Sequence, residues 1–165
     1  MQKHGLILGL VVLLAGPSIT GCMVPETHRT FSKDRLSQIA RSPSRHAGQL
    51  YAFQGRVISA TEEDGLLAFQ MLAADHRRDF GGGSLFVMTT LTSLPVARDH
   101  DVRVLGRSGG SLEGTNAFGG SVSSITMKAI AIWDMTANRI AWDDSEEDTY
   151  RKWESGELFA PRQSR

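Results

Sequence analysis

Five segments with the periodicity of a β-strand constrain this chain most. The first, residues 49–60 (QLYAFQGRVISA), alternates between its two faces as a half-buried strand does. Four further strand-like segments follow it, at residues 66–73, 85–91, 101–107 and 124–133. The 17 glycines supply the turns of a small β domain, and a single cysteine excludes an internal disulfide. We therefore expect a mainly β domain that is held together by its core.

The number and spacing of these strands match the OB-fold, a small, partly closed, five-stranded Greek-key barrel. Gly55 in the first strand and Gly106 in the fourth mark places where a barrel strand bends or another backbone approaches closely. Residues 108–110 (SGG) predict a turn, and the glycine-rich residues 111–120 predict a hairpin or loop. We expect a barrel over residues 48–134, with another small β-sandwich or meander as the alternative.

A short helix is expected before the barrel, within a segment at residues 22–47 that otherwise serves as a tether. In residues 34–40 (DRLSQIA), Leu36 and Ile39 are three positions apart and share one helix face. Pro43 disfavours helical geometry at the residue before it, so the helix should end there.

The C-terminal tail, residues 135–165, is acidic and predicts a second helix. Ser145 and Asp148 resemble a capping box, and a helix from there would run to about residue 155, where Gly156 would end it. Tyr150 and Trp153 share one stripe of this helix. Two interpretations are open: the helix docks on its own barrel, or it offers an acidic, aromatic arm to a partner protein of the cell envelope.

Residues 1–21 have the organisation of a secretory signal peptide. Lys3 and His4 form a basic start, and the apolar run at residues 5–15 (GLILGLVVLLA) follows. This run is shorter than the roughly 20 residues that a membrane-spanning helix needs. We expect a signal-peptide helix that is removed on secretion; a plain N-terminal anchor or a buried helix is the alternative.

Residues 19–22 (ITGC) resemble the lipobox of bacterial lipoproteins, with Ile where Leu is usual. The resemblance implies that Cys22 becomes the first residue of the mature chain. It would carry a thioether-linked diacylglycerol and an N-acyl chain such as palmitate. Several acyl chains anchor a soluble domain, whereas one chain binds a membrane only marginally. Met23, in place of an Asp retention signal, implies the outer membrane, with the domain facing the periplasm.

Three further stretches are similar to the starvation-inducible (Slp) outer-membrane lipoproteins. They are residues 42–48 (SPSRHAG), residues 55–57 (GRV) before an acidic turn, and residues 102–106 (VRVLG). The similarity would cover residues 22–134. The chain departs from that family in its acidic C-terminal tail, because the family tail is rich in Gly, Pro, Tyr and Trp. The resemblance implies a lipoprotein of the outer membrane.

No sequence motif points to catalysis. The histidines are scattered and lack metal-ligand spacing, and they are His4, His28, His46, His76 and His100. The glycines at residues 81–83 precede a strand and lack the Gly-Lys-Ser/Thr of a phosphate loop. We therefore expect no enzyme activity, no metal and no cofactor beyond the covalent lipid on Cys22.

Any ligand is expected over the second and third strands, where OB-folds bind oligonucleotides and oligosaccharides. The candidate residues are Gln70, Arg77, Arg78 and Phe86. A formal net charge of zero, and Asp75 and Asp79 beside the two arginines, argue against nucleic acid. Two hypotheses follow. One is a lipid-anchored envelope lipoprotein with a binding or structural role. The other is a periplasmic OB module that binds a glycan, a peptide or an oligonucleotide.

Overall fold

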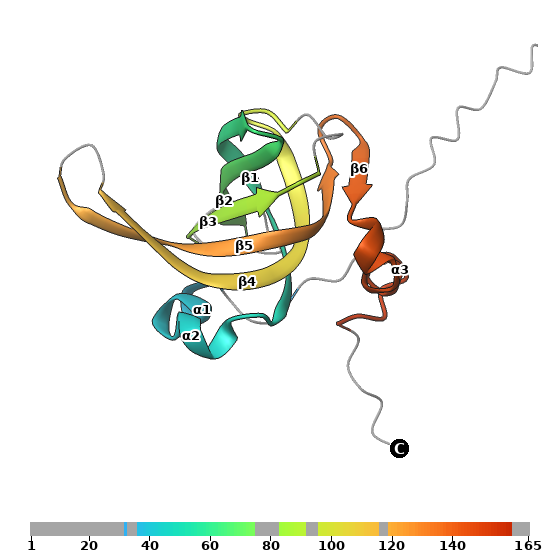
Figure 1. Ribbon diagram of the computed structural model, residues 1–165, viewed down its shortest axis with the longest axis horizontal. Coiled ribbons are helices and arrows are strands. Elements are labelled where there is room, and N and C mark those ends of the chain that lie inside the picture. Colours follow the sequence, from blue (N-terminus) through green and yellow to red (C-terminus); the bar gives the residue numbers. More distant parts are fainter. Residues whose placement is uncertain (1–31, 33–35, 75–82, 92–95, 116–118, 160–165) are drawn as a thin grey trace, which may run out of the picture.

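Six strands dominate the architecture in a computed structural model of the chain (Figure 1). The structure describes residues 32, 36–74, 83–91, 96–115 and 119–159. The strands are β1 (Leu50–Glu63), β2 (Leu66–Ala74), β3 (Ser84–Thr89), β4 (Asp101–Thr115), β5 (Ser121–Asp134) and β6 (Arg139–Trp142). The helices are α1 (Leu36–Arg41), α2 (Pro43–His46), the 3₁₀ turn η3 (Asp144–Glu146) and α3 (Glu147–Glu154). The signal peptide and Cys22 lie outside the described residues.

The first five strands close into a barrel. The strand order is β3-β2-β1-β4-β5-β6, and β3 also pairs with β5. This last pairing is parallel and runs from Leu85 beside Ile125 to Met88 beside Lys128. The long strand β1 pairs with β4 along its first half and with β2 along its second half. This topology confirms the predicted five-stranded, OB-like barrel.

The two predicted strand glycines lie where neighbouring backbones come into close contact. A Cβ atom at Gly55 would collide with the carbonyl oxygen of Leu72 on β2. A Cβ atom at Gly106 would collide with the carbonyl oxygen of Lys128 on β5. Both positions therefore require glycine because the backbone of the neighbouring strand lies where a Cβ atom would be, and such a close approach is one of the two roles expected for them.

The core fills the barrel, and α1 closes one of its ends. Leu36 and Ile39 are buried there, as the spacing predicts. They join a cluster of barrel side chains that includes Tyr51, Phe53, Phe69, Met71, Leu85, Val87, Val104, Met127 and Ile132. Pro43 stands in the first turn of α2, where its missing N–H does no harm. The proline therefore ends one helix and begins a second, which the sequence did not predict.

β4 and β5 continue beyond the barrel as a two-stranded arm (Figure 1). The predicted turn at residues 108–110 is wrong, because β4 runs on to Thr115. The ladder instead shifts register between Ser108 and Gly110, and Gly110 has a φ of +105°. Glycine in this conformation is typical of a β-bulge, which bends a strand without reversing it.

The C-terminal helix α3 docks on the outside of the barrel. Tyr150 and Trp153 are 1% and 0% exposed. They pack in a second apolar cluster with Ala52, Leu105, Ile130 and Ala131. Trp142 at the end of β6 stacks on Tyr150, with 4.5 Å between the ring centroids. Of the two interpretations of the tail, the structure supports docking on its own barrel.

The C-terminal end of α3 agrees with the sequence-based prediction, and its N-terminal end does not. The predicted capping box is wrong, because Ser145 does not cap α3. Its backbone N–H and its hydroxyl both donate to the carboxylate of Asp143, at 2.9 and 2.6 Å, and Asp143 is the N-cap of η3. At the other end Gly156 has a φ of +81°, as expected for the residue that ends a helix. None of the helices described here is long and apolar enough to cross a membrane.

Candidate ligand-binding face

The outer surface of β2 and β3 carries a short strip of half-buried apolar side chains. Burial alternates along both strands, so that Phe69, Met71, Leu85 and Val87 point into the core. The outward positions that alternate with them include Gln70, Leu72, Phe86 and Met88, all half-buried. We refer to these four outward residues as the β2–β3 face. Its aromatic ring and thioether are available to pack against a ligand.

Two of the four predicted site residues are brought together. Gln70 and Phe86 are direct cross-strand partners in the β2–β3 ladder. Arg77 and Arg78 lie outside the described residues. Phe69, one position from Gln70, belongs to the core, so the alternation of the strand separates the two phenylalanines.

Hydrogen bonds fix the polar groups beside this strip. The Nε2 of Gln70 donates to the Oγ of Ser84 at 2.5 Å. The Oγ of Ser124, on β5, lies 3.5 Å from the same hydroxyl. An amide and two hydroxyls from three adjacent strands therefore border Phe86, with the amide orientation set by its partner.

Two cations of the described residues lie beside the β2–β3 face. Lys128 on β5 is exposed and stands beside Met88 in the β3–β5 ladder. Arg56 on β1 is opposite Leu72, but its guanidinium makes two hydrogen bonds to Asp101, at 2.9 and 3.3 Å. These bonds and the charge of Asp101 raise the pKa of Arg56 above its ordinary value. The Arg56 cation is thus paired with a carboxylate.

The β2–β3 face has the composition of a small contact surface. It combines apolar contact area with oriented hydrogen-bonding groups, as many binding surfaces do. Across the part of the chain that the structure describes, no three His, Cys, Asp or Glu side chains converge as metal ligands would.

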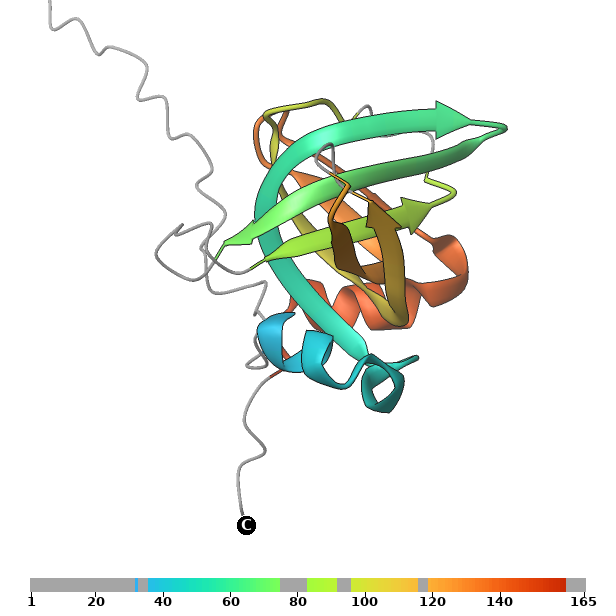
Figure 2. The same cartoon turned by 90° about the vertical axis from the view of Figure 1, so that its left-hand side faces the viewer.

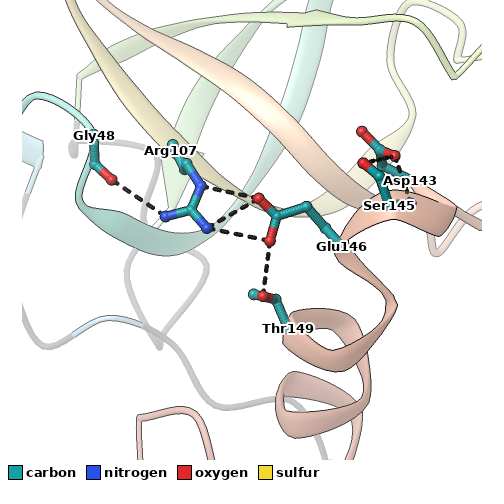
Figure 3. A network of polar contacts seen from close by, with 6 residues as sticks. All are labelled: Gly48, Arg107, Asp143, Ser145, Glu146 and Thr149. Carbon is teal, nitrogen blue, oxygen red and sulfur yellow. Dashed lines mark hydrogen bonds and ion pairs between the residues drawn. The ribbon is translucent and has the colours of Figure 1, made fainter.

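A polar clasp holds α3 against the barrel on another side of the molecule (Figure 3). The guanidinium of Arg107 on β4 donates from Nε and Nη2 to the Glu146 carboxylate, at distances of 2.9 to 3.1 Å. Thr149 donates to the same carboxylate at 2.8 Å. The hydrogen bond from Thr149, and then that from Arg107, lower the pKa of Glu146. The sequence showed a basic strand end and an acidic tail but not that these two residues meet.

The clasp predicts an acid-sensitive contribution to stability. Because the pKa of Glu146 is lower in the folded state, its contribution is fully present above the ordinary value of 4.5 and is lost as the pH falls through the folded value. We expect Glu146→Gln to lower the free energy of unfolding at pH 7 by about 0.5–1 kcal/mol. The difference from the parent chain should shrink in urea titrations at a pH well below 4.5. A difference that stays the same at both pH values would contradict this role for Glu146.

A second pair is buried where β4 begins and β5 ends. The Asp134 side chain is 0% exposed, and its Oδ2 lies 2.6 Å from the Nδ1 of His100. Its Oδ1 accepts a hydrogen bond from the backbone N–H of Ala137 at 2.9 Å. The pair joins the two strands at the end of the barrel away from α1. His100 and Asp134 are 34 positions apart, so the sequence carries no local signal that they pair.

Comparisons with known proteins give only distant structural likenesses. No family model matches the chain, and no curated protein is significantly similar to it in sequence. Solved structures that resemble it include the mitochondrial single-stranded DNA-binding protein Rim1 of S. cerevisiae. The two chains share 11% identity over 58% of this chain and 97% of that chain, with a TM-score of 0.36.

A small single-stranded DNA-binding protein of Streptomyces coelicolor is similar at the same level. It shares 16% identity over 60% of this chain and 97% of that chain, with a TM-score of 0.36. Likenesses this distant do not indicate what the present chain binds. The fold assignment rests instead on the strand order and the parallel β3–β5 closure described above.

Proposed function

We propose that this chain is a lipid-anchored binding protein of the bacterial outer membrane, and that its barrel holds an extended ligand across the β2–β3 face in the periplasm. The observation that carries the proposal is the half-buried, outward-facing Phe86, with Met88 on the same strand and Gln70 directly across the ladder. OB-folds use this surface for chain-like ligands. We propose a binding role without catalysis.

The chemistry of the face favours an oligosaccharide among the possible ligands. Proteins that bind single-stranded nucleic acid combine a positive groove with aromatic side chains on which successive bases stack. On the β2–β3 face Phe86 is the only aromatic residue, and the nearby Arg56 is paired with Asp101. Amide and hydroxyl groups beside one ring suit the hydroxyls and apolar faces of sugar rings. A peptide or an oligonucleotide is the alternative outcome of the binding test.

Phe86→Ala should weaken ligand binding about tenfold or more, because it removes the aromatic ring from the face and with it apolar contact area. The measurement is titration calorimetry of the full chain in detergent with three probes: oligosaccharide fragments of the cell wall, a neutral peptide, and a single-stranded DNA oligonucleotide. Leu112→Ala is the matched control, because Leu112 is an apolar side chain, 48% exposed, on the β4–β5 arm. Tight DNA binding, or equal losses for the two variants, would overturn the assignment.

Cys22→Ser should abolish lipidation and release the protein from the membrane. Without the thiol no diacylglycerol can be attached, and the domain has only weak attractions left to hold it on a bilayer. We expect the parent chain to incorporate radiolabelled palmitate and to sediment with outer membranes, and the variant to do neither. If the variant still sediments with the membrane fraction, the proposed anchor is wrong.

A further inference from the structure

The tether enters the barrel at the end that α1 closes. Ser32 is hydrogen-bonded to Ala52 on β1, with its N–H donating to the Ala52 carbonyl at 3.1 Å and its Oγ accepting from the Ala52 N–H at 2.8 Å. The buried helix α1 begins only four residues later, at Leu36. Ten residues therefore separate Cys22 from a fixed point on the barrel. Fully extended, such a segment spans at most about 35 Å.

The same end of the barrel presents positive charge to solvent. Arg41 and Arg45 are exposed on α1 and α2, and His46 follows them. Residues 36–49 contain no Asp or Glu. The exposed carboxylates Glu62, Asp64 and Asp99 lie in the turn after β1 and near the start of β4, away from this end. The acidic segment η3–α3 lies closer, and its Glu146 is paired with Arg107, which also donates to the Gly48 carbonyl. In Figure 2 the blue and cyan helices α1 and α2 stand at one end of β1, and the β1–β2 hairpin stands at the other.

We propose that the exposed surface of α1 and α2 rests on the anionic headgroups of the membrane that holds the lipid anchor. The inference rests on the proposed lipidation of Cys22. A bilayer is favoured over an acidic protein as the partner, because the tether joins the barrel at this end and keeps it within about 35 Å of the membrane. Each cation close to an anionic surface strengthens the attraction about fivefold, within a Debye length of roughly 8–10 Å.

This contact would orient the whole domain. The β1–β2 hairpin would point away from the bilayer, because β1 runs outward from α2 to Glu63. The β2–β3 face would then stand to the side of the barrel, open to a ligand that lies along the membrane.

The test uses fluorescent probes on the lipidated full chain in vesicles. Once Cys22 carries lipid, Ser44→Cys on α2 supplies a single free thiol for labelling, and Thr61→Cys near the far end of β1 supplies its control; both sites are exposed. In vesicles with 30% phosphatidylglycerol, we expect the probe at residue 44 to be shielded from aqueous iodide severalfold more than the probe at residue 61. The shielding should vanish in pure phosphatidylcholine, in 0.5 M salt, and in the Arg41→Glu/Arg45→Glu variant.

The outcomes separate the contact from the anchor. Equal quenching at residues 44 and 61, in protein that still floats with the vesicles, would overturn the contact and leave the anchor standing. Failure of the full chain to float with vesicles after processing would overturn both. Shielding that survives charge reversal would also overturn the contact, because the attraction would then not depend on the arginines. Circular dichroism of each variant confirms that the barrel is folded.

Discussion

Replacing Trp153 by Ala will lower the free energy of unfolding by about 3–5 kcal/mol, the usual cost of removing a large buried aromatic side chain. Trp153 is 0% exposed and fills the space between α3 and the outer surface of the barrel. Its neighbours Ala52 and Ala131 are too small to move into the cavity that the substitution leaves. Equilibrium unfolding in urea, followed by circular dichroism, measures the change.

The exposed neighbour Lys152 provides the control for this variant. Lys152→Ala leaves the helix and its contacts in place, so it should change stability by no more than about 0.5 kcal/mol. If Trp153→Ala costs less than about 1 kcal/mol, then α3 does not form part of the folded domain in solution, and the tail would be free for the alternative role of a partner-binding arm.

The second large effect is expected at the buried pair of His100 and Asp134. His100→Ala removes the imidazole from the Asp134 carboxylate, which is 0% exposed and still accepts a hydrogen bond from the Ala137 N–H. Breaking a buried pair in this way costs about 3 kcal/mol or more, because one charge stays behind without compensation. Thermal and urea unfolding at pH 7 measure the loss.

Arg98→Ala serves as the control for His100→Ala. The Arg98 side chain is 78% exposed and lies two residues away, so its removal should change stability by no more than about 0.5 kcal/mol. Equal stability of the His100 and Arg98 variants would show that the imidazole does not compensate the buried carboxylate.

The strands were predictable because their burial is periodic. Alternation located β1 to β5, and the glycines at positions 55 and 106 marked the close strand crossings. The predicted turn at residues 108–110 failed for a physical reason: glycine suits both a turn and a bulge, and only the pairing of β4 with β5 decides between them. β6 was not predicted, because its four residues are too few to show a periodic pattern and its strand geometry comes from pairing with β5.

The candidate site was only partly predictable. Fold class and alternation were enough to place Gln70 and Phe86 on one surface, since both are set by local pattern and strand register. The pairings of Arg107 with Glu146 and of His100 with Asp134 could not be predicted, because the paired residues are 39 and 34 positions apart. Such contacts depend on how the strands are arranged in space, and a single sequence carries no local signal for them.

The most direct test of the account is to locate the ligand on the surface. An NMR titration of the isotope-labelled full chain in detergent with a cell-wall oligosaccharide should shift the amide resonances of Gln70, Leu72, Phe86 and Met88 most strongly. Resonances of α3 and of the β4–β5 arm should shift much less. Shifts centred on α3 or on the arm, with the β2–β3 face unchanged at saturation, would contradict the proposed binding function.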